Sequence, residues 1–287
     1  MQYKRITVVS CFLVVLVAVA MHPVLEARQQ KLKPEELIAK HLDSIGTPDA
    51  RKAVSSRTTS GTVQVSFRVG GSGTLNGKAN ILSQTNLVRL GFGFGAIEYP
   101  GEQVAFDGSK VTAGMMSPGN YPPFSGFVYE HDFLLKEGLL FGSLSTAWGL
   151  YDIASKKARL DSTGVKKVDG KQLYELKYNS RNSRANVQAW FYFEPETFRH
   201  VRSQFKLEVP ASRMANISDS AELVRYQIVE RFDEFKQVDG LTLPHSHNLE
   251  FTVDAPRGGI LTTWTHNIER ITHGESLNRE LFSLNSK

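Results

Sequence analysis

The chain has 287 residues, of which 22% are charged, and its formal net charge at pH 7 is +5. Charges of both signs are interspersed, without a block of one sign or a cluster of basic and aromatic residues, so the sequence gives no support for nucleic-acid binding. Cys11 is the single cysteine, which leaves the chain after it without a disulfide, a cysteine metal site or a thiol nucleophile.

The first 27 residues have the layout of a secretory signal peptide. Two basic residues precede the apolar run Ile6–Ala20, and Ala27 offers a small residue at a cleavage point. The run is shorter than the roughly 20 apolar residues that span a bilayer as a helix. We therefore expect residues 1–27 to be removed on export to the periplasm, leaving residues 28–287 as a single domain. A retained membrane anchor and cleavage after Ala20 are the alternatives.

The segment that follows predicts one helix and then a set of strands. Pro34 suits the first turn of a helix, an apolar stripe follows it, and Gly46 is a good stop. Alternation of apolar and polar residues then predicts strands over 62–69, 74–83, 87–94, 103–106 and 109–112. The last two are joined by Asp107-Gly108, which is a strong hairpin signal.

The middle of the chain is more apolar than the rest and changes its pattern. Met116–Gly126 is rich in proline and glycine and is predicted to be a loop. From Phe127 to Tyr151 the apolar spacing becomes helical, and Gly138 and Gly142 are expected to divide it into two short helices. This stretch lies between two sets of strands, so we expect it to cover the face of a sheet.

The second half of the chain predicts an antiparallel meander. Its strand-like segments are 173–178, 187–193, 198–209, 226–235, 241–253 and 260–268. Alternation means that one face of the sheet is buried and the other is solvated. The predicted fold class is therefore mainly β (α+β), a strongly curved antiparallel half-barrel with a helical lid made of the Pro34 helix and the 127–151 segment.

The sheet and the lid are expected to enclose an apolar cavity. The predicted lining residues are Phe67, Phe92, Phe133, Leu134, Leu139, Leu140, Phe141, Phe191, Phe205, Phe251 and Trp264. Such a cavity suits an acyl chain, because each buried methylene contributes about 0.8 kcal/mol and no specific side chain is required. An ordinary filled core is the alternative for any one of these residues. No catalytic residue and no cofactor are predicted.

A metal-dependent hydrolase is the rival function. His245 and His247 are alternate residues of a predicted strand and could share a metal if His266 or His273 supplied a third ligand. The sequence has no His-Glu-x-x-His helix and no Gly-x-Ser-x-Gly turn. Carboxylates such as Glu230 are expected on the outer face of a strand. A non-catalytic envelope scaffold that binds proteins through a sheet edge or the convex face is a third reading.

Three stretches of sequence resemble the LolA/LolB-like group of periplasmic lipoprotein carriers. They are 35–42 (EELIAKHL), 191–198 (FYFEPETF) and 238–244 (VDGLTLP), within a likeness that spans about residues 33–285. The resemblance implies an incomplete, curved antiparallel barrel with helices as a lid, and a non-enzymatic carrier of lipid or lipoprotein acyl chains, possibly with membrane-bound donor and acceptor proteins. It also implies an arginine on an early strand that holds the lid, for which Arg57, Arg68 and Arg89 are candidates.

Overall fold

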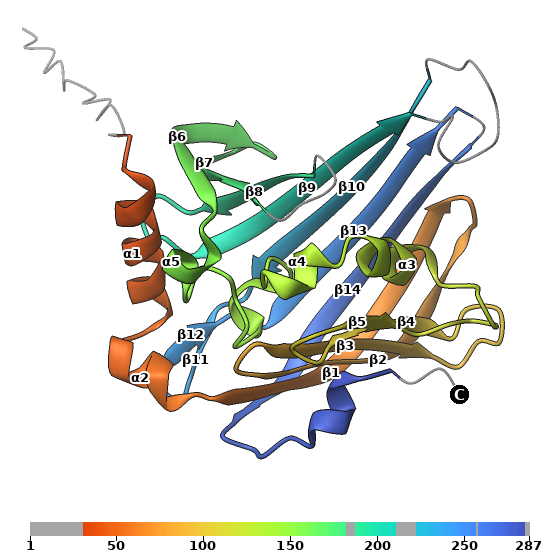
Figure 1. Ribbon diagram of the computed structural model, residues 1–287, viewed down its shortest axis with the longest axis horizontal. Coiled ribbons are helices and arrows are strands. Elements are labelled where there is room, and N and C mark those ends of the chain that lie inside the picture. Colours follow the sequence, from red (N-terminus) through yellow and green to blue (C-terminus); the bar gives the residue numbers. More distant parts are fainter. Residues whose placement is uncertain (1–30, 182–186, 211–221, 257, 285–287) are drawn as a thin grey trace, which may run out of the picture. The chain divides into compact units, whose positions relative to one another are not determined.

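Antiparallel strands build one large sheet in the computed structural model, which describes residues 31–181, 187–210, 222–256 and 258–284 (Figure 1). The predicted signal peptide, residues 1–27, lies outside the described residues. Within them, the strands of this sheet are β1 (Ser56–Val69), β2 (Gly73–Gln84), β3 (Leu87–Phe94), β4 (Gly101–Phe106), β5 (Val111–Ala113), β6 (Arg159–Val168), β7 (Lys171–Asn179), β8 (Gln188–Phe193), β9 (His200–Pro210), β10 (Leu223–Asp233), β13 (Ser246–Ala255) and β14 (Gly258–His273).

The first and last strands of the sheet in the sequence, β1 and β14, are neighbours in the middle of the sheet. The strand order is β5-β4-β3-β2-β1-β14-β13-β10-β9-β8-β7-β6, and neighbouring strands are antiparallel. β1 pairs along its length with β14, with Val65 opposite Trp264. The sheet is curved and does not close, so β5 and β6 are its edges. A separate small ladder joins β11 (Lys236–Val238) to β12 (Leu241–Leu243).

Two helices precede the sheet. α1 (Pro34–Ile45) begins with a proline at its first turn, where the missing N–H costs nothing, and Glu36 accepts a hydrogen bond from the Lys33 backbone N–H at 3.0 Å. Its buried face includes Leu37 and His41. α2 (Pro48–Ala53) follows directly, and a short 3-10 helix, η3 (Arg279–Phe282), ends the described chain.

The apolar middle segment lies over one face of the sheet. We call residues 123–156 the helical insert; its helices are α3 (Pro123–Glu130), α4 (Phe133–Lys136), η1 (Gly142–Leu144) and α5 (Ile153–Lys156). Figure 1 shows α3 and α4 lying across the sheet in front of β13 and β14. We call the sheet face that the insert covers the concave face. The apolar side chains of the insert and of this face belong to one buried cluster.

The predicted fold class is confirmed, and the differences lie in one strand that was not predicted and in the boundaries of others. β6 is a strand that the sequence pattern did not reveal, because a register shift between Ser162 and Gly164 interrupts its alternation. The stretch 241–253 is divided into β12 and β13, with Pro244 between them. α3 begins inside the predicted 116–126 loop.

The insert also forms shorter helices than the two expected. Gly138, Phe141 and Gly142 all have positive φ angles, of 66°, 70° and 49°. These left-handed residues lie after the end of α4 and up to the first residue of η1, where they prevent one right-handed helix from running through.

Candidate functional site

The predicted lining residues converge on the concave face. All of them except Phe67 are buried, and they belong to one hydrophobic cluster. Period 2 places alternate residues of each strand on this face, which is how Phe92 and Trp264 come to stack with their ring centroids 6.3 Å apart. Phe67 is half-buried near the end of β1, where it packs edge-on against Tyr99 at 5.0 Å.

The insert places further aromatic residues on this face, among them Phe124 and Trp148. Phe124 of α3 lies 5.7 Å from the Trp264 ring and 6.0 Å from the Phe251 ring. Trp148 lies 5.0 Å from Phe191 at the other side of the face. Both are buried, and neither was among the predicted lining residues. The apolar stripe of the insert was the available signal, but the α3 part of it lay in a segment expected to be a loop.

A buried carboxylate holds α3 to the sheet. Glu102 of β4 is fully buried and accepts hydrogen bonds from the Ser125 backbone N–H at 2.8 Å and from the Ser125 hydroxyl. The Tyr99 hydroxyl donates to it at 3.0 Å, and Tyr99 in turn accepts from the Trp264 indole at 3.0 Å. Burial raises the pKa of Glu102 to about 7, although the hydrogen bonds from Ser125 and Tyr99 oppose the shift.

A second buried carboxylate holds the centre of the insert. Glu230 of β10 is fully buried, and one of its oxygens accepts from the Phe141 backbone N–H at 2.9 Å. The same oxygen lies 3.0 Å from His247 Nε2. The expectation that Glu230 lies on the outer face is therefore wrong. Glu230 has the same strand parity as Ile228 and Phe232, both buried, so the alternation that predicted their inward direction applied to it as well.

Unpartnered polar atoms surround this contact. His266 of β14 lies opposite His247 of β13, with ring centroids 6.3 Å apart. Glu230 Oε2, His247 Nδ1 and both ring nitrogens of His266 are buried without a hydrogen-bond partner among the described residues. Burial lowers the pKa of His266 to about 3, so its ring is neutral at physiological pH.

Arg57 is the arginine that contacts the insert. It is buried at the start of β1, and its guanidinium donates to the backbone carbonyl of Ser143 and, at 3.0 Å, to His273 Nε2. Arg89 instead donates to the Leu281 carbonyl and to the Gln103 side chain, and neither residue belongs to the insert. Arg68, the third candidate, is exposed near the end of β1, so Arg57 is the one of the three whose side chain bonds to the insert.

A further carboxylate points from the insert toward the sheet. Glu137 follows α4, is 5% exposed, and accepts from the hydroxyls of Tyr178 at 2.7 Å and Ser180 at 2.6 Å. Burial and this contact raise the pKa of Tyr178. The insert is thus joined to the sheet by side-chain hydrogen bonds at several separate points.

The two histidines of the hydrolase reading do not share a site. β13 begins at Ser246, so His245 precedes the strand, and its Nδ1 lies 3.1 Å from the Leu243 carbonyl. His247 points to the concave face and contacts Glu230. The described part of the chain contains no group of three or more His, Cys, Asp or Glu side chains placed to hold a metal ion.

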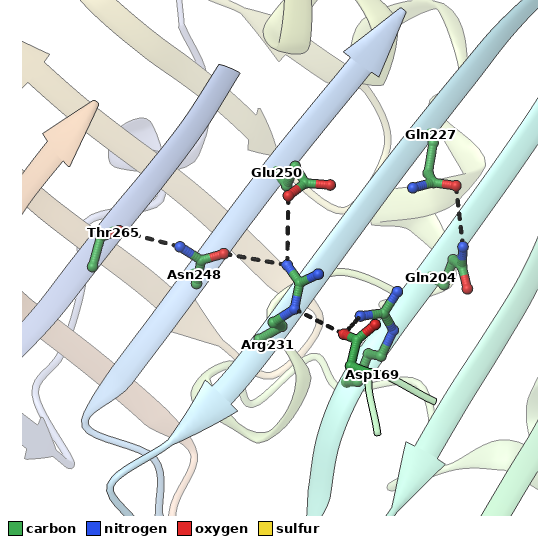
Figure 2. A network of polar contacts seen from close by, with 8 residues as sticks. Asp169, Gln204, Gln227, Arg231, Asn248, Glu250 and Thr265 are labelled. Carbon is green, nitrogen blue, oxygen red and sulfur yellow. Dashed lines mark hydrogen bonds and ion pairs between the residues drawn. The ribbon is translucent and has the colours of Figure 1, made fainter. Parts of the chain in front are cut away.

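The opposite face of the sheet is polar. Figure 2 shows a network that crosses β9, β10, β13 and β14, in which Arg231 lies 3.3 Å from Asp169 and 3.7 Å from Glu250. Asn248 donates to the Thr265 hydroxyl at 3.1 Å in the same network. The buried apolar side chains of the sheet therefore gather on the concave face, under the insert. None of the described helices is both long and apolar enough to cross a bilayer.

Comparison with known proteins finds likeness in structure. No family model and no curated protein matches the sequence. A LolA superfamily protein from Nitrosomonas europaea matches at 14% identity and a TM-score of 0.47, covering 88% of this chain and 98% of its own. A domain titled as an outer membrane lipoprotein-sorting protein, from Vibrio parahaemolyticus, matches at 13% identity and a TM-score of 0.40, covering 85% and 95%.

A DUF1329 family protein from Desulfovibrio piger matches at 10% identity and a TM-score of 0.39, covering 87% of this chain and 96% of its own. Each of these three matches has a TM-score below 0.5.

Proposed function

We propose that this protein binds the acyl part of a lipid or lipoprotein between the concave face and the helical insert. The observation that supports the proposal is the character of the insert. It buries Leu134, Leu139, Leu140, Phe141 and Leu144 against the sheet, each at 1% exposure or less. These side chains lie on a curved surface of aromatic and aliphatic residues, and an acyl chain could replace them with contacts of the same chemical kind.

The magnitudes are compatible with such an exchange. Burial of one leucine or phenylalanine side chain contributes about 1.5–3 kcal/mol, so displacing the five named side chains costs about 7–15 kcal/mol. An acyl chain with about 14 methylenes recovers about 11 kcal/mol at about 0.8 kcal/mol each. The gain from a single long acyl chain thus falls within the range of the displacement cost, whereas a chain of half that length recovers less than the lowest value of that range.

The insert is built from short pieces that favour local opening. Its four helical pieces contain between three and eight residues, too few to be stable as isolated helices. They are held by hydrogen bonds to Arg57, Glu102 and Glu230 of the sheet and by the bond that Glu137 of the insert accepts from Tyr178, while the strands beneath them are held by continuous ladders. Local opening therefore disrupts fewer interactions in the insert than in the sheet. We propose that the insert acts as the lid.

The cellular setting belongs to the same proposal. The signal-peptide layout of residues 1–27 favours export, and we propose that the protein acts in the periplasm without catalysing a reaction. A carrier in that compartment exchanges its cargo with donor and acceptor proteins at the membranes. The convex network of charged and amide side chains is exposed there to solvent or to such partners.

Uptake of a fluorescent long-chain fatty acid tests the proposal. The native protein is expected to bind it, and Leu140→Glu is expected to reduce uptake by at least tenfold, because a charge in an apolar site is costly. Ile97→Glu is the matched control, since Ile97 is 96% exposed and lies outside the insert. Circular dichroism establishes that both variants keep the sheet.

Two results would overturn the proposal. One is equal uptake by Leu140→Glu and the native protein, which would remove the insert from the site. The other is native protein that takes up no fatty acid and carries no lipid when its organic extract is analysed by mass spectrometry after purification from the periplasm.

A further inference from the structure

A pocket beside the insert has a basic lining. It has a volume of about 250 Å³ and lies between α1, α2, the start of β1, the insert and β12. Arg51, Lys52 and Arg57 line it, together with Thr146 and Tyr151, and its other lining residues are apolar. None of the described residues that line it is acidic. This pocket is separate from the aromatic surface proposed for acyl chains.

Arg57 brings a buried positive charge to the pocket. The residue is 2% exposed, and no carboxylate lies within 4.0 Å of its guanidinium among the described residues. Its Nε donates to His273, whose Nδ1 lies 2.8 Å from Asp239, so the carboxylate of Asp239 is linked to Arg57 through His273. The comparably buried Arg202 has a direct ion pair with Asp169. A buried guanidinium without such a partner favours a bound anion.

The two other basic residues, Arg51 and Lys52, add positive charge to the pocket. Arg51 donates to the carbonyls of Leu42 and Gly46, and its nearest carboxylate, Asp43, is 3.7 Å away and 74% exposed. Lys52 is exposed and has no ion-pair partner in the part of the chain that the structure describes. An anion in the pocket would reduce the repulsion among the three cations.

We propose that this pocket binds a phosphate group. A phosphate presents several acceptor oxygens to the guanidinium of Arg57, the ammonium of Lys52 and the hydroxyl of Tyr151. The apolar remainder of the lining accommodates the carbon skeleton of a phosphate ester. The group could come from free inorganic phosphate or from a lipid headgroup. The proposal does not depend on acyl-chain binding at the concave face.

Isothermal titration of the full chain with inorganic phosphate, at neutral pH and low ionic strength, tests the site. Saturable binding of one phosphate per chain is expected, and Lys52→Ala should weaken it by about fivefold or more. Lys78→Ala is the matched control, because it removes the same charge from an exposed position on β2 outside the pocket. Both lysines are at exposed positions, so neither substitution should disturb the fold. A third variant, Arg57→Lys, tests the contribution of the buried guanidinium to phosphate binding.

Co-sedimentation separates the two sources of phosphate. A lipid headgroup would be identified if the native protein sediments with phosphatidylglycerol vesicles and Lys52→Ala does so less than Lys78→Ala. Binding of inorganic phosphate without this vesicle difference would identify a free anion, and both results support the site. Absence of saturable phosphate binding, or equal weakening by Lys52→Ala and Lys78→Ala, would overturn it. Fatty-acid uptake by the same proteins reports separately on the acyl site.

Discussion

At the residue scale, Glu230 joins the insert to two strands through one carboxylate. It accepts from the Phe141 backbone N–H and contacts His247 while fully buried. Removing the carboxylate leaves both partners buried and unpaired, at a cost of about 1–3 kcal/mol each. We therefore expect Glu230→Ala to lower the free energy of unfolding by about 2–5 kcal/mol in urea titrations.

Glu250 provides the control for this substitution. It lies on the neighbouring strand β13, its side chain is 27% exposed, and its ion pair with Arg231 is long, at 3.7 Å. Partly exposed pairs of this kind contribute less than about 1 kcal/mol, so Glu250→Ala should have a small effect. Equal losses from Glu230→Ala and Glu250→Ala would show that the buried contact with the insert adds nothing.

At the element scale, Gly138 determines how the insert folds back on itself. Its φ angle is +66°, and a Cβ atom placed there would lie 1.8 Å from the Ala147 carbonyl oxygen. The Gly149 N–H also donates to the Gly138 carbonyl at 2.8 Å. Gly138→Ala must therefore push the two limbs of the insert apart. We expect faster hydrogen exchange of insert amides in this variant, with the amides of the central strands unchanged.

Gly170 separates backbone strain from this steric clash. It has a φ of +82° in the turn between β6 and β7, and an added Cβ would meet no atom within 4 Å. Gly170→Ala therefore reports the cost of the left-handed conformation alone, about 1 kcal/mol. The prediction for the insert fails if Gly138→Ala and Gly170→Ala destabilise the protein equally and leave insert exchange unchanged.

At the scale of the whole molecule, buried neutral histidines make the fold sensitive to acid. Burial lowers the pKa of His41 to about 4 and that of His266 to about 3, and it lowers the pKa of His200 well below 6.5. The hydrogen bonds of His41 fit a neutral ring, which lies 3.1 Å from the Phe198 carbonyl and accepts from the Trp148 indole at 3.1 Å. Unfolded histidines bind protons below about pH 6.5, whereas these folded ones do not.

The free energy of unfolding should therefore fall as the pH falls from about 6.5 toward 4. Each buried histidine lowers the free energy of unfolding by up to about 2 kcal/mol at pH 5, since one pKa unit corresponds to about 1.4 kcal/mol. Glu102 acts in the opposite direction, because its raised pKa means that the folded state binds its proton first. With three histidines against one glutamate, the net change is a loss of stability.

Thermal unfolding at pH 7.5 and pH 5 checks this expectation. The midpoint should be lower at pH 5, and His266→Leu should reduce the difference between the two, because it removes one buried histidine whose ring nitrogens have no partner among the described residues. A midpoint that does not change between the two pH values would contradict the assignment of neutral buried rings.

Local sequence patterns predicted most strands and the direction of several side chains on the concave face. Leu87–Phe94 alternates without interruption, and β3 has those bounds. The same alternation placed Phe205 and Phe251 on one buried face. It failed at Glu230 because residue type was weighted above strand parity, and at β6 because a bulge breaks the period. The insert was recognised as apolar, but its left-handed residues divided it into pieces that spacing does not reveal.

By itself, the sequence determined the fold class, because alternation, turn residues and apolar runs are local properties. It predicted an antiparallel sheet with one apolar face and an apolar segment to cover it. Tertiary structure decided what meets at that face. The pairing of β1 with β14 and the contacts from Arg57, Glu102 and Glu230 to the insert join residues far apart in the chain. Such contacts depend on strand order and on the desolvation of each group, which no short window of sequence contains.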